Sequence, residues 1–169
     1  MKSKNSARIF YLAIALAVVL LDRWSKHLVA RRIGLYQHIQ IIPGFFRLTH
    51  TENTGAAFSL FADTITPWKT GLLIAFSVVA LIVVSILLWK NQHAHIATGI
   101  GLSLIMGGAI GNLWDRVARG RVVDFLLFYV KRYQWPVFNL ADSAIVVGAG
   151  LLVLEIIFAK SHPQHGMAD

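Results

Sequence analysis

Two aspartates in this sequence lie among apolar residues with no basic residue beside them. Asp124 is part of Val122–Phe125 (VVDF), and Asp142 is part of Asn139–Ser143 (NLADS). Removing an unpaired carboxyl from water raises its pKa. When two such carboxyls share a site, their pKa values separate, so that one holds a proton while the other is ionised. The pattern indicates general acid–base chemistry by a carboxyl pair.

Such a pair suits the hydrolysis of a peptide bond by an activated water molecule. The ionised Asp would take a proton from water as it attacks the carbonyl, and the protonated Asp would hydrogen-bond the carbonyl oxygen and protonate the leaving amine. No covalent intermediate is needed. The alternative for Asp142 is that it only caps the helix predicted to follow it, since acids favour helix N-termini.

A second polar group precedes Asp124. Asn112, Asp115 and Arg116 follow one another at helical spacing. In one interpretation Asn112 binds the substrate backbone while Asp115 and Arg116 pair to brace the site. In the other, Asn112 is a polar contact between helices and the pair lies on the surface. Gly120 is expected to end this helix as a C-cap.

Other catalytic schemes find little support in the sequence. There is no cysteine, which excludes a thiol nucleophile and a disulfide. There is no His-Glu-x-x-His zinc motif and no Gly-x-Ser-x-Gly elbow. Ser25 and Lys26 are adjacent, so they would not face one another on a helix. His93 and His95 are read as loop residues, with a weak metal site as the alternative. We predict neither a metal nor another cofactor.

The composition indicates how these residues are positioned. Hydrophobic residues make up 56% of the 169 residues and charged residues 14%, too apolar for a soluble domain. We predict an all-α polytopic membrane protein that forms a single membrane-embedded domain over residues 1–169. The expected spans lie at about 8–30, 68–89, 96–119 and 137–159, each long enough for the hydrocarbon core as a helix. Gly107 and Gly111 in the third span favour close helix packing.

The first span is the weakest, because its apolar run is short enough for the core of a signal peptide. No small-x-small cleavage site follows it. If the helix continues to about residue 30, Asp22 and Lys26 lie on one face at i,i+4, and the span is retained. Residues 31–67 contain no long apolar run, and Pro43-Gly44 and Asn53–Gly55 predict turns. We therefore expect a small extramembrane β-platform at about 31–67, between spans one and two.

Four spans would place nearly all of the acidic residues on one side of the membrane. Only Glu155 and Asp169 of the eight would lie elsewhere. A transporter or channel, the main alternative, predicts acids spread through the depth of the membrane. A scaffold protein, the third option, leaves acids at a membrane boundary unexplained.

The net charge of +8 lies between and beside apolar runs, so we expect membrane lipids rather than nucleic acid as its partner. Only five of the sixteen Lys and Arg residues would lie on the side of the termini (Lys2, Lys4, Arg8, Lys90 and Lys160). A simple positive-inside count would then place the acidic side in the cytoplasm.

Five blocks of the sequence, in order, carry a resemblance to a known family. They are Asp22–Lys26 (DRWSK), Asn53–Ser59 (NTGAAFS), Gly107–Arg116 (GGAIGNLWDR), Val122–Phe125 (VVDF) and Phe138–Ser143 (FNLADS). From the first span to the fourth, the chain resembles the lipoprotein signal peptidase (signal peptidase II) family of aspartic peptidases.

The resemblance implies an aspartic endopeptidase that acts at the membrane boundary and removes signal peptides from diacylglyceryl-modified prolipoproteins, cleaving before the lipidated cysteine. It implies a multi-pass protein of the bacterial inner (cytoplasmic) membrane, with cytoplasmic termini and a periplasmic active site. The positive-inside count predicts the opposite orientation, and we adopt the orientation that the resemblance implies. No obligate protein partner is implied.

The resemblance also assigns roles to individual residues. Asp124 and Asp142 match the catalytic dyad. Other positions match residues that line or brace the substrate site, namely Asn53, Gly108, Asn112, Arg116, Asn139 and Ala141. Asp22 and Asp115 match supporting acids.

Overall fold

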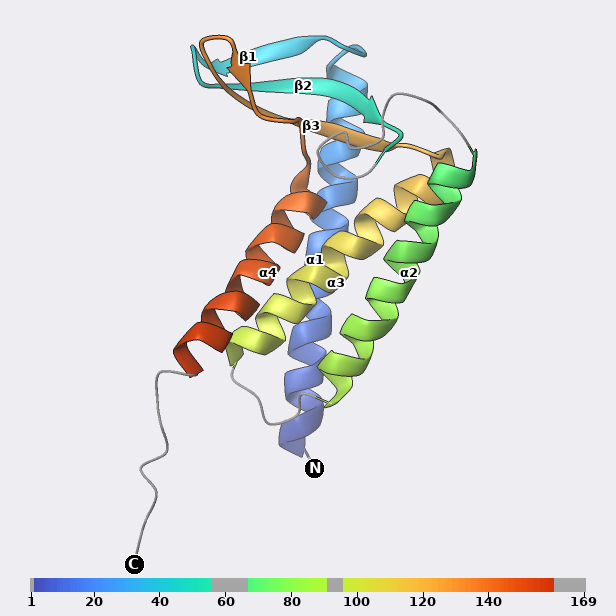
Figure 1. Cartoon of the computed structure of the whole chain (residues 1–169), viewed down its shortest axis with the longest axis vertical. Helices are drawn as coiled ribbons and strands as arrows, with labels where there is room; N and C mark the ends of the chain where they lie inside the picture. The colour runs from blue at the N-terminus through green and yellow to red at the C-terminus, as the bar shows by residue number, and fades with distance from the viewer. Residues whose placement is uncertain (1, 56–66, 91–95, 160–169) are drawn as a thin grey trace, which may run out of the picture.

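The computed structural model describes residues 2–55, 67–90 and 96–159. The described chain contains four helices, α1 (Lys2–Arg32), α2 (Pro67–Lys90), α3 (Ile96–Arg119) and α4 (Leu140–Ala159). Its strands are β1 (His38–Ile42), β2 (Phe46–Asn53), β3 (Val122–Val130) and β4 (Tyr133–Gln134). The helices form a bundle with the sheet at one end (Figure 1). Asp63, His93, His95 and the end of the Asn53–Ser59 block lie outside the described residues.

Three of these helices, α2, α3 and α4, are long and apolar enough to cross a membrane. Helix α1 is longer, at 31 residues, but it carries charged residues near both ends, including Arg8, Asp22 and Lys26. The structure thus confirms a membrane protein with a small sheet. The fourth span stays a prediction.

Helix α3 is the centre of the bundle and packs against each of the other three helices, whereas α1 and α2 have few contacts with each other. Glycines permit this close packing. A Cβ on Gly107 would lie 2.6 Å from the main-chain oxygen of Ala15 in α1, and a Cβ on Gly101 would lie 2.9 Å from that of Gly148 in α4. The predicted packing role of Gly107 is therefore confirmed.

The sheet is antiparallel, in the order β1-β2-β3-β4. Strands β1 and β2 lie within the platform predicted at about 31–67, and the sheet also contains β3 and β4, which were not predicted. Strand β3, which follows α3, pairs along β2 and places Asp124 opposite Thr51. The sheet is therefore built from two segments of the chain, one before α2 and one after α3.

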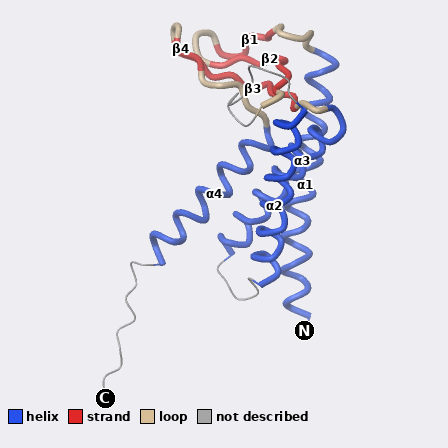
Figure 2. Tube along the Cα trace, turned by 45° about the vertical axis from the view of Figure 1, so that its right-hand side comes forward, coloured by secondary structure: helices blue, strands red, loops and turns tan. Residues whose placement is uncertain are grey.

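Local contacts fix where the sheet sits on the bundle. Gly120 has a φ of 69° and donates its N–H to the carbonyl of Arg116 at 2.9 Å, so it ends α3 as predicted. The chain then enters β3, where Val123 and Phe125 pack with Val29 of α1 and with Ile33, the residue after this helix. The sheet therefore lies over the end of α1 (Figure 2), and β3 carries Asp124 to the ends of the helices.

Candidate active site

Asp124 is held by two amide side chains. It lies in β3 with only 2% of its surface exposed. One carboxyl oxygen, Oδ2, accepts a hydrogen bond from Nδ2 of Asn53 at 2.8 Å, and the other, Oδ1, accepts one from Nδ2 of Asn139 at 2.7 Å. Both bonds fix the carboxyl in place without supplying a full positive charge.

Asp142 lies in the first turn of α4. Its N–H donates to Oδ1 of Asn139 at 2.9 Å, and its Oδ2 accepts from the N–H of Asn139 at 3.2 Å. This is a reciprocal capping arrangement in which Asn139 is the cap. The other oxygen, Oδ1, accepts from Nδ2 of Asn112 in α3 at 2.8 Å. Asp142 therefore helps to cap the helix, but capping uses only one of its oxygens.

Asn139 connects the two carboxyls that the sequence predicted to act together. It is fully buried, and it contacts Asp124 through its side-chain amide and Asp142 through its main-chain N–H and side-chain oxygen. Burial, together with the negative charge of Asp142, raises the pKa of Asp124 from 3.8 to about 7. The hydrogen bonds from Asn53 and Asn139 act in the opposite direction.

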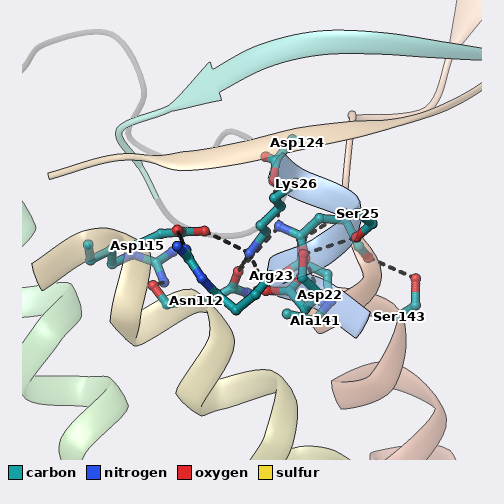
Figure 3. Close-up of polar contacts among 12 residues, drawn as sticks. Asp22, Arg23, Ser25, Lys26, Asn112, Asp115, Asp124, Ala141 and Ser143 are labelled. Carbon is teal, nitrogen blue, oxygen red and sulfur yellow. Dashed lines mark hydrogen bonds and ion pairs between the residues drawn. The ribbon is translucent and has the colours of Figure 1, made fainter. Parts of the chain in front are cut away.

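A second buried group lies beside this pair, centred on Lys26 (Figure 3). Its Nζ lies 2.7 Å from Oδ2 of Asp22, 2.9 Å from Oδ2 of Asp115 and 3.0 Å from Oδ1 of Asn112. Arg23 also forms an ion pair with Asp115. The predicted pairing of Asp22 with Lys26 is confirmed, and both of these supporting acids have cationic partners.

The predicted pair between Asp115 and Arg116 was wrong. Adjacent residues on a helix point in different directions, and Asp115 forms its ion pairs with Lys26 and Arg23 on α1. Arg116 instead donates to the main-chain oxygens of Asn112 and Gly55, each at 3.3 Å. Arg23 was expected to lie close to acids that could neutralise it, but sequence reasoning did not predict that its partner is Asp115.

Gly108 and Ala141 bring α3 and α4 together at the site. A Cβ on Gly108 would lie 2.4 Å from the main-chain oxygen of Ala141, which is itself fully buried. The N–H of Ala141 donates to Oδ1 of Asp22 at 3.1 Å. Because the backbones are this close, Asn112 can reach Asp142 across the helix pair. The predicted residues thus come together, from Asn53 in β2 to Asp142 in α4.

No group of three or more His, Cys, Asp or Glu side chains suited to a metal ion occurs in the described ranges. Amide groups and cationic side chains hold the carboxyls at the site. Two adjoining buried carboxyls are suited to proton transfer.

Fold and site together define a membrane protein with a buried carboxyl pair where its helix bundle meets a surface sheet. A family model for signal peptidase (SPase) II matches residues 14–158, and the chain belongs to that family. The predicted resemblance is therefore confirmed, and the chain is a peptidase of a bacterial membrane.

Individual relatives agree with this assignment. The chain is 45% identical to a lipoprotein signal peptidase of Haemophilus ducreyi over 150 residues, which cover 89% of this chain and 92% of the relative. It is 42% identical to one from Solibacter usitatus over 147 residues, covering 87% and 90%. A solved structure described as a bacterial membrane enzyme superposes with a TM-score of 0.84 at 27% identity, covering 95% of this chain and 94% of that one.

Proposed function

We propose that this protein is an aspartic endopeptidase that removes signal peptides from diacylglyceryl-modified prolipoproteins by cleaving before the lipidated cysteine. The observation that carries the proposal is the meeting of Asp124 and Asp142 at Asn139, both buried and both held by amides. The relatives named lipoprotein signal peptidases support the substrate.

The proposed reaction needs one proton shared by the two carboxyls. With its pKa raised to about 7, Asp124 favours a singly protonated pair at neutral pH. The ionised carboxyl takes a proton from water, and the resulting hydroxide attacks the peptide carbonyl carbon. The protonated carboxyl hydrogen-bonds the carbonyl oxygen, and a proton from the pair passes to the amine as the C–N bond breaks. The pair ends with one proton, as it began.

The surrounding residues have positioning roles in this proposal. Asn53, Asn112 and Asn139 orient the carboxyls through the hydrogen bonds described above. Arg116 is half-buried, and its guanidinium donates to the main-chain oxygens of Asn112 and Gly55 at 3.3 Å. A guanidinium has five N–H donors, so it has further donors to offer a substrate carbonyl. The acids paired with Lys26, and the close approach of Gly108 to Ala141, hold the helices that carry the dyad.

We propose that α1 is the fourth span, and that residues 1–169 act as one domain with cytoplasmic termini and a periplasmic site at the inner membrane. The ion pairs of the site weaken the charge argument against this orientation. Arg23 and Lys26 pair with buried acids, and Arg121 lies 3.0 Å from Glu52. These cations are neutralised locally, so a simple count of Lys and Arg overstates the positive charge on that side.

The direct test uses purified protein in detergent and a peptide with a diacylglyceryl-modified cysteine. Wild type should cleave before that cysteine. Asp124→Asn and Asp142→Asn should each lose at least about 10³-fold in kcat/KM, since the acid–base pair is removed. Glu52→Gln is the matched control, because it makes the same chemical change in β2 beside Asn53 but outside the dyad.

Protein folding in each variant is checked by thermal unfolding. If the folded dyad variants cleave as well as wild type, the assignment of the dyad is wrong. If folded wild type leaves the lipid-modified peptide intact, the proposed substrate is wrong.

A further inference from the structure

A separate cavity lies at the other end of the helix bundle, near the start of α1 and the end of α2. Its volume is about 270 Å³. It is lined by residues of α1, α2 and α3, namely Arg8, Leu12, Ser85, Leu88, Trp89 and Met106. None of these residues belongs to the carboxyl site, which lies where the opposite helix ends meet the sheet (Figure 1).

Arg8 gives this cavity a positive charge. Its Cζ lies 4.1 Å from the centre of the Trp89 ring, so the guanidinium is stacked on the indole. Its Nε is buried and has no hydrogen-bond partner in the part of the chain that the structure describes. A guanidinium nitrogen can only donate, and burying one without an acceptor is costly. Because Arg8 also lines the cavity, an acceptor that enters the cavity would meet this guanidinium group.

The acidic residues that the structure describes are arranged so that none neutralises Arg8. All of them except Glu155 lie in the sheet or at the end of the helix bundle beside it. Glu155 of α4 accepts a hydrogen bond from Thr98. The same end of the bundle carries Lys90, an exposed cation in the last turn of α2. The electrostatic preference at the cavity is therefore for an anion.

Apart from Ser85, the remaining lining is apolar. Leu88 and Met106 are buried, while Leu12 and Trp89 are exposed on the outside of the bundle, where lipid would lie. Trp and Arg near the end of a spanning helix belong at the depth of the lipid headgroups. A phospholipid has both features that this cavity favours, namely an anionic phosphate at the depth of the headgroups and hydrocarbon chains below it.

We propose that this cavity binds an anionic phospholipid, with the phosphate on Arg8 and part of an acyl chain against Leu12, Leu88 and Met106. The lipid would fill the space between α1 and α2, which pack on α3 but have few contacts with each other. Its role is to join those two helices at the end of the bundle remote from the dyad. The proposal does not depend on which substrate the dyad cleaves.

The test measures lipid binding by native mass spectrometry of the delipidated full chain in detergent. The probes are dioleoyl-phosphatidylglycerol and dioleoyl-phosphatidylcholine, which have the same acyl chains but different net charge. Wild type should bind phosphatidylglycerol about fivefold more tightly, which corresponds to ~1 kcal/mol for one cation near an anionic headgroup. Arg8→Gln should remove this preference. Lys90→Gln, which removes a cation outside the cavity, should retain it.

A second measurement locates the lipid. Phosphatidylglycerol with brominated acyl chains should quench tryptophan fluorescence in wild type, and Trp89→Phe should lose that component because its indole lines the cavity. The quenching should also weaken in Arg8→Gln. Equal binding of the two lipids by wild type would overturn the proposal, as would an unchanged preference in folded Arg8→Gln. If Lys90→Gln lost the preference for phosphatidylglycerol as fully as Arg8→Gln, the preference would come from the general surface charge and the proposed site would be wrong.

Discussion

Two groups of buried aspartates meet at the same end of this molecule, and they differ in their partners. Asp22 and Asp115 form ion pairs with Lys26, and Asp115 also pairs with Arg23. In the described chain, Asp124 and Asp142 form no ion pair, and amide and main-chain N–H groups hold them. A cation in contact favours the ionised form of a buried carboxyl, whereas an amide orients the carboxyl without adding a full positive charge. The first group is therefore suited to structure and the second to proton transfer.

Asn112 joins these two groups, and the chemistry of Lys26 fixes which way it points. An ammonium group only donates, so the amide oxygen of Asn112 must face Lys26, at 3.0 Å. Nδ2 of Asn139 donates to the same oxygen at 3.2 Å. The amide nitrogen of Asn112 is thereby directed to Asp142. Lys26, which is paired with Asp22 and Asp115, thus determines the hydrogen bond that Asp142 receives from Asn112.

Removing the charge of Lys26 should have the largest effect on this arrangement. Lys26→Met leaves Asp22 and Asp115 buried with one cation fewer between them, and we expect a loss of about 3–5 kcal/mol in the free energy of unfolding. Chemical denaturation in detergent measures it, with Lys90→Met as the control for an exposed lysine. A loss below about 1 kcal/mol would show that Lys26 does not neutralise these acids.

The dyad should be sensitive to the distance between α3 and α4, because Asn112 and Asp142 lie on different helices. Gly108→Ala places a methyl group 2.4 Å from the main-chain oxygen of Ala141, where backbone must move. We expect a cost of about 1–3 kcal/mol together with reduced kcat. Gly150→Ala in α4, where a Cβ meets no atom within 4 Å, should be neutral or slightly stabilising. Equal effects from both variants would contradict the packing argument.

Much of this comparison could be predicted from the sequence. The isolated setting of Asp124 and Asp142 indicated a carboxyl pair, and the i,i+4 spacing of Asp22 and Lys26 indicated a local ion pair. Both inferences depend only on neighbouring residues and on the cost of burying a charge. The long apolar runs of α2 and α3 were equally clear, because length and hydropathy decide them.

What the sequence could not show depends on contacts between distant segments. Asp115 lies next to Arg116 in the chain, but the structure pairs it with Arg23, 92 positions earlier, because α1 and α3 pack together. Strand β3 was missed because its apolar residues fill both faces and show no alternation of apolar and polar residues. Its pairing with β2 is decided by where α3 ends, at Gly120.

The amide partners of Asp124 can be tested through the pH dependence of cleavage. Above the pKa of about 7 both carboxyls are ionised and the acid is lost, so kcat/KM should fall on the alkaline side near pH 7. The hydrogen bond from Asn53 lowers the pKa of Asp124. Asn53→Ala should therefore raise that pKa and move the alkaline limb to higher pH.

Thr51→Val is the matched control for this shift. Its hydroxyl donates to the main-chain oxygen of Asp124 at 3.1 Å, not to the carboxyl. The limb should stay where it is in Thr51→Val. A limb that moves to lower pH in Asn53→Ala would show that Asn53 does not stabilise the ionised carboxyl.

The smallest effect is expected at an ion pair outside both groups. Nη1 of Arg121 lies 3.0 Å from Oε2 of Glu52, but the two side chains are 51% and 24% exposed, against 3% for Lys26. Water and salt screen such a pair, so Arg121→Gln should cost about 0.2–1 kcal/mol, and less as the salt concentration rises. The same denaturation experiment measures it beside Lys26→Met. If the two variants cost the same, burial does not distinguish these ion pairs, and the structural role assigned to Asp22 and Asp115 would need another cause.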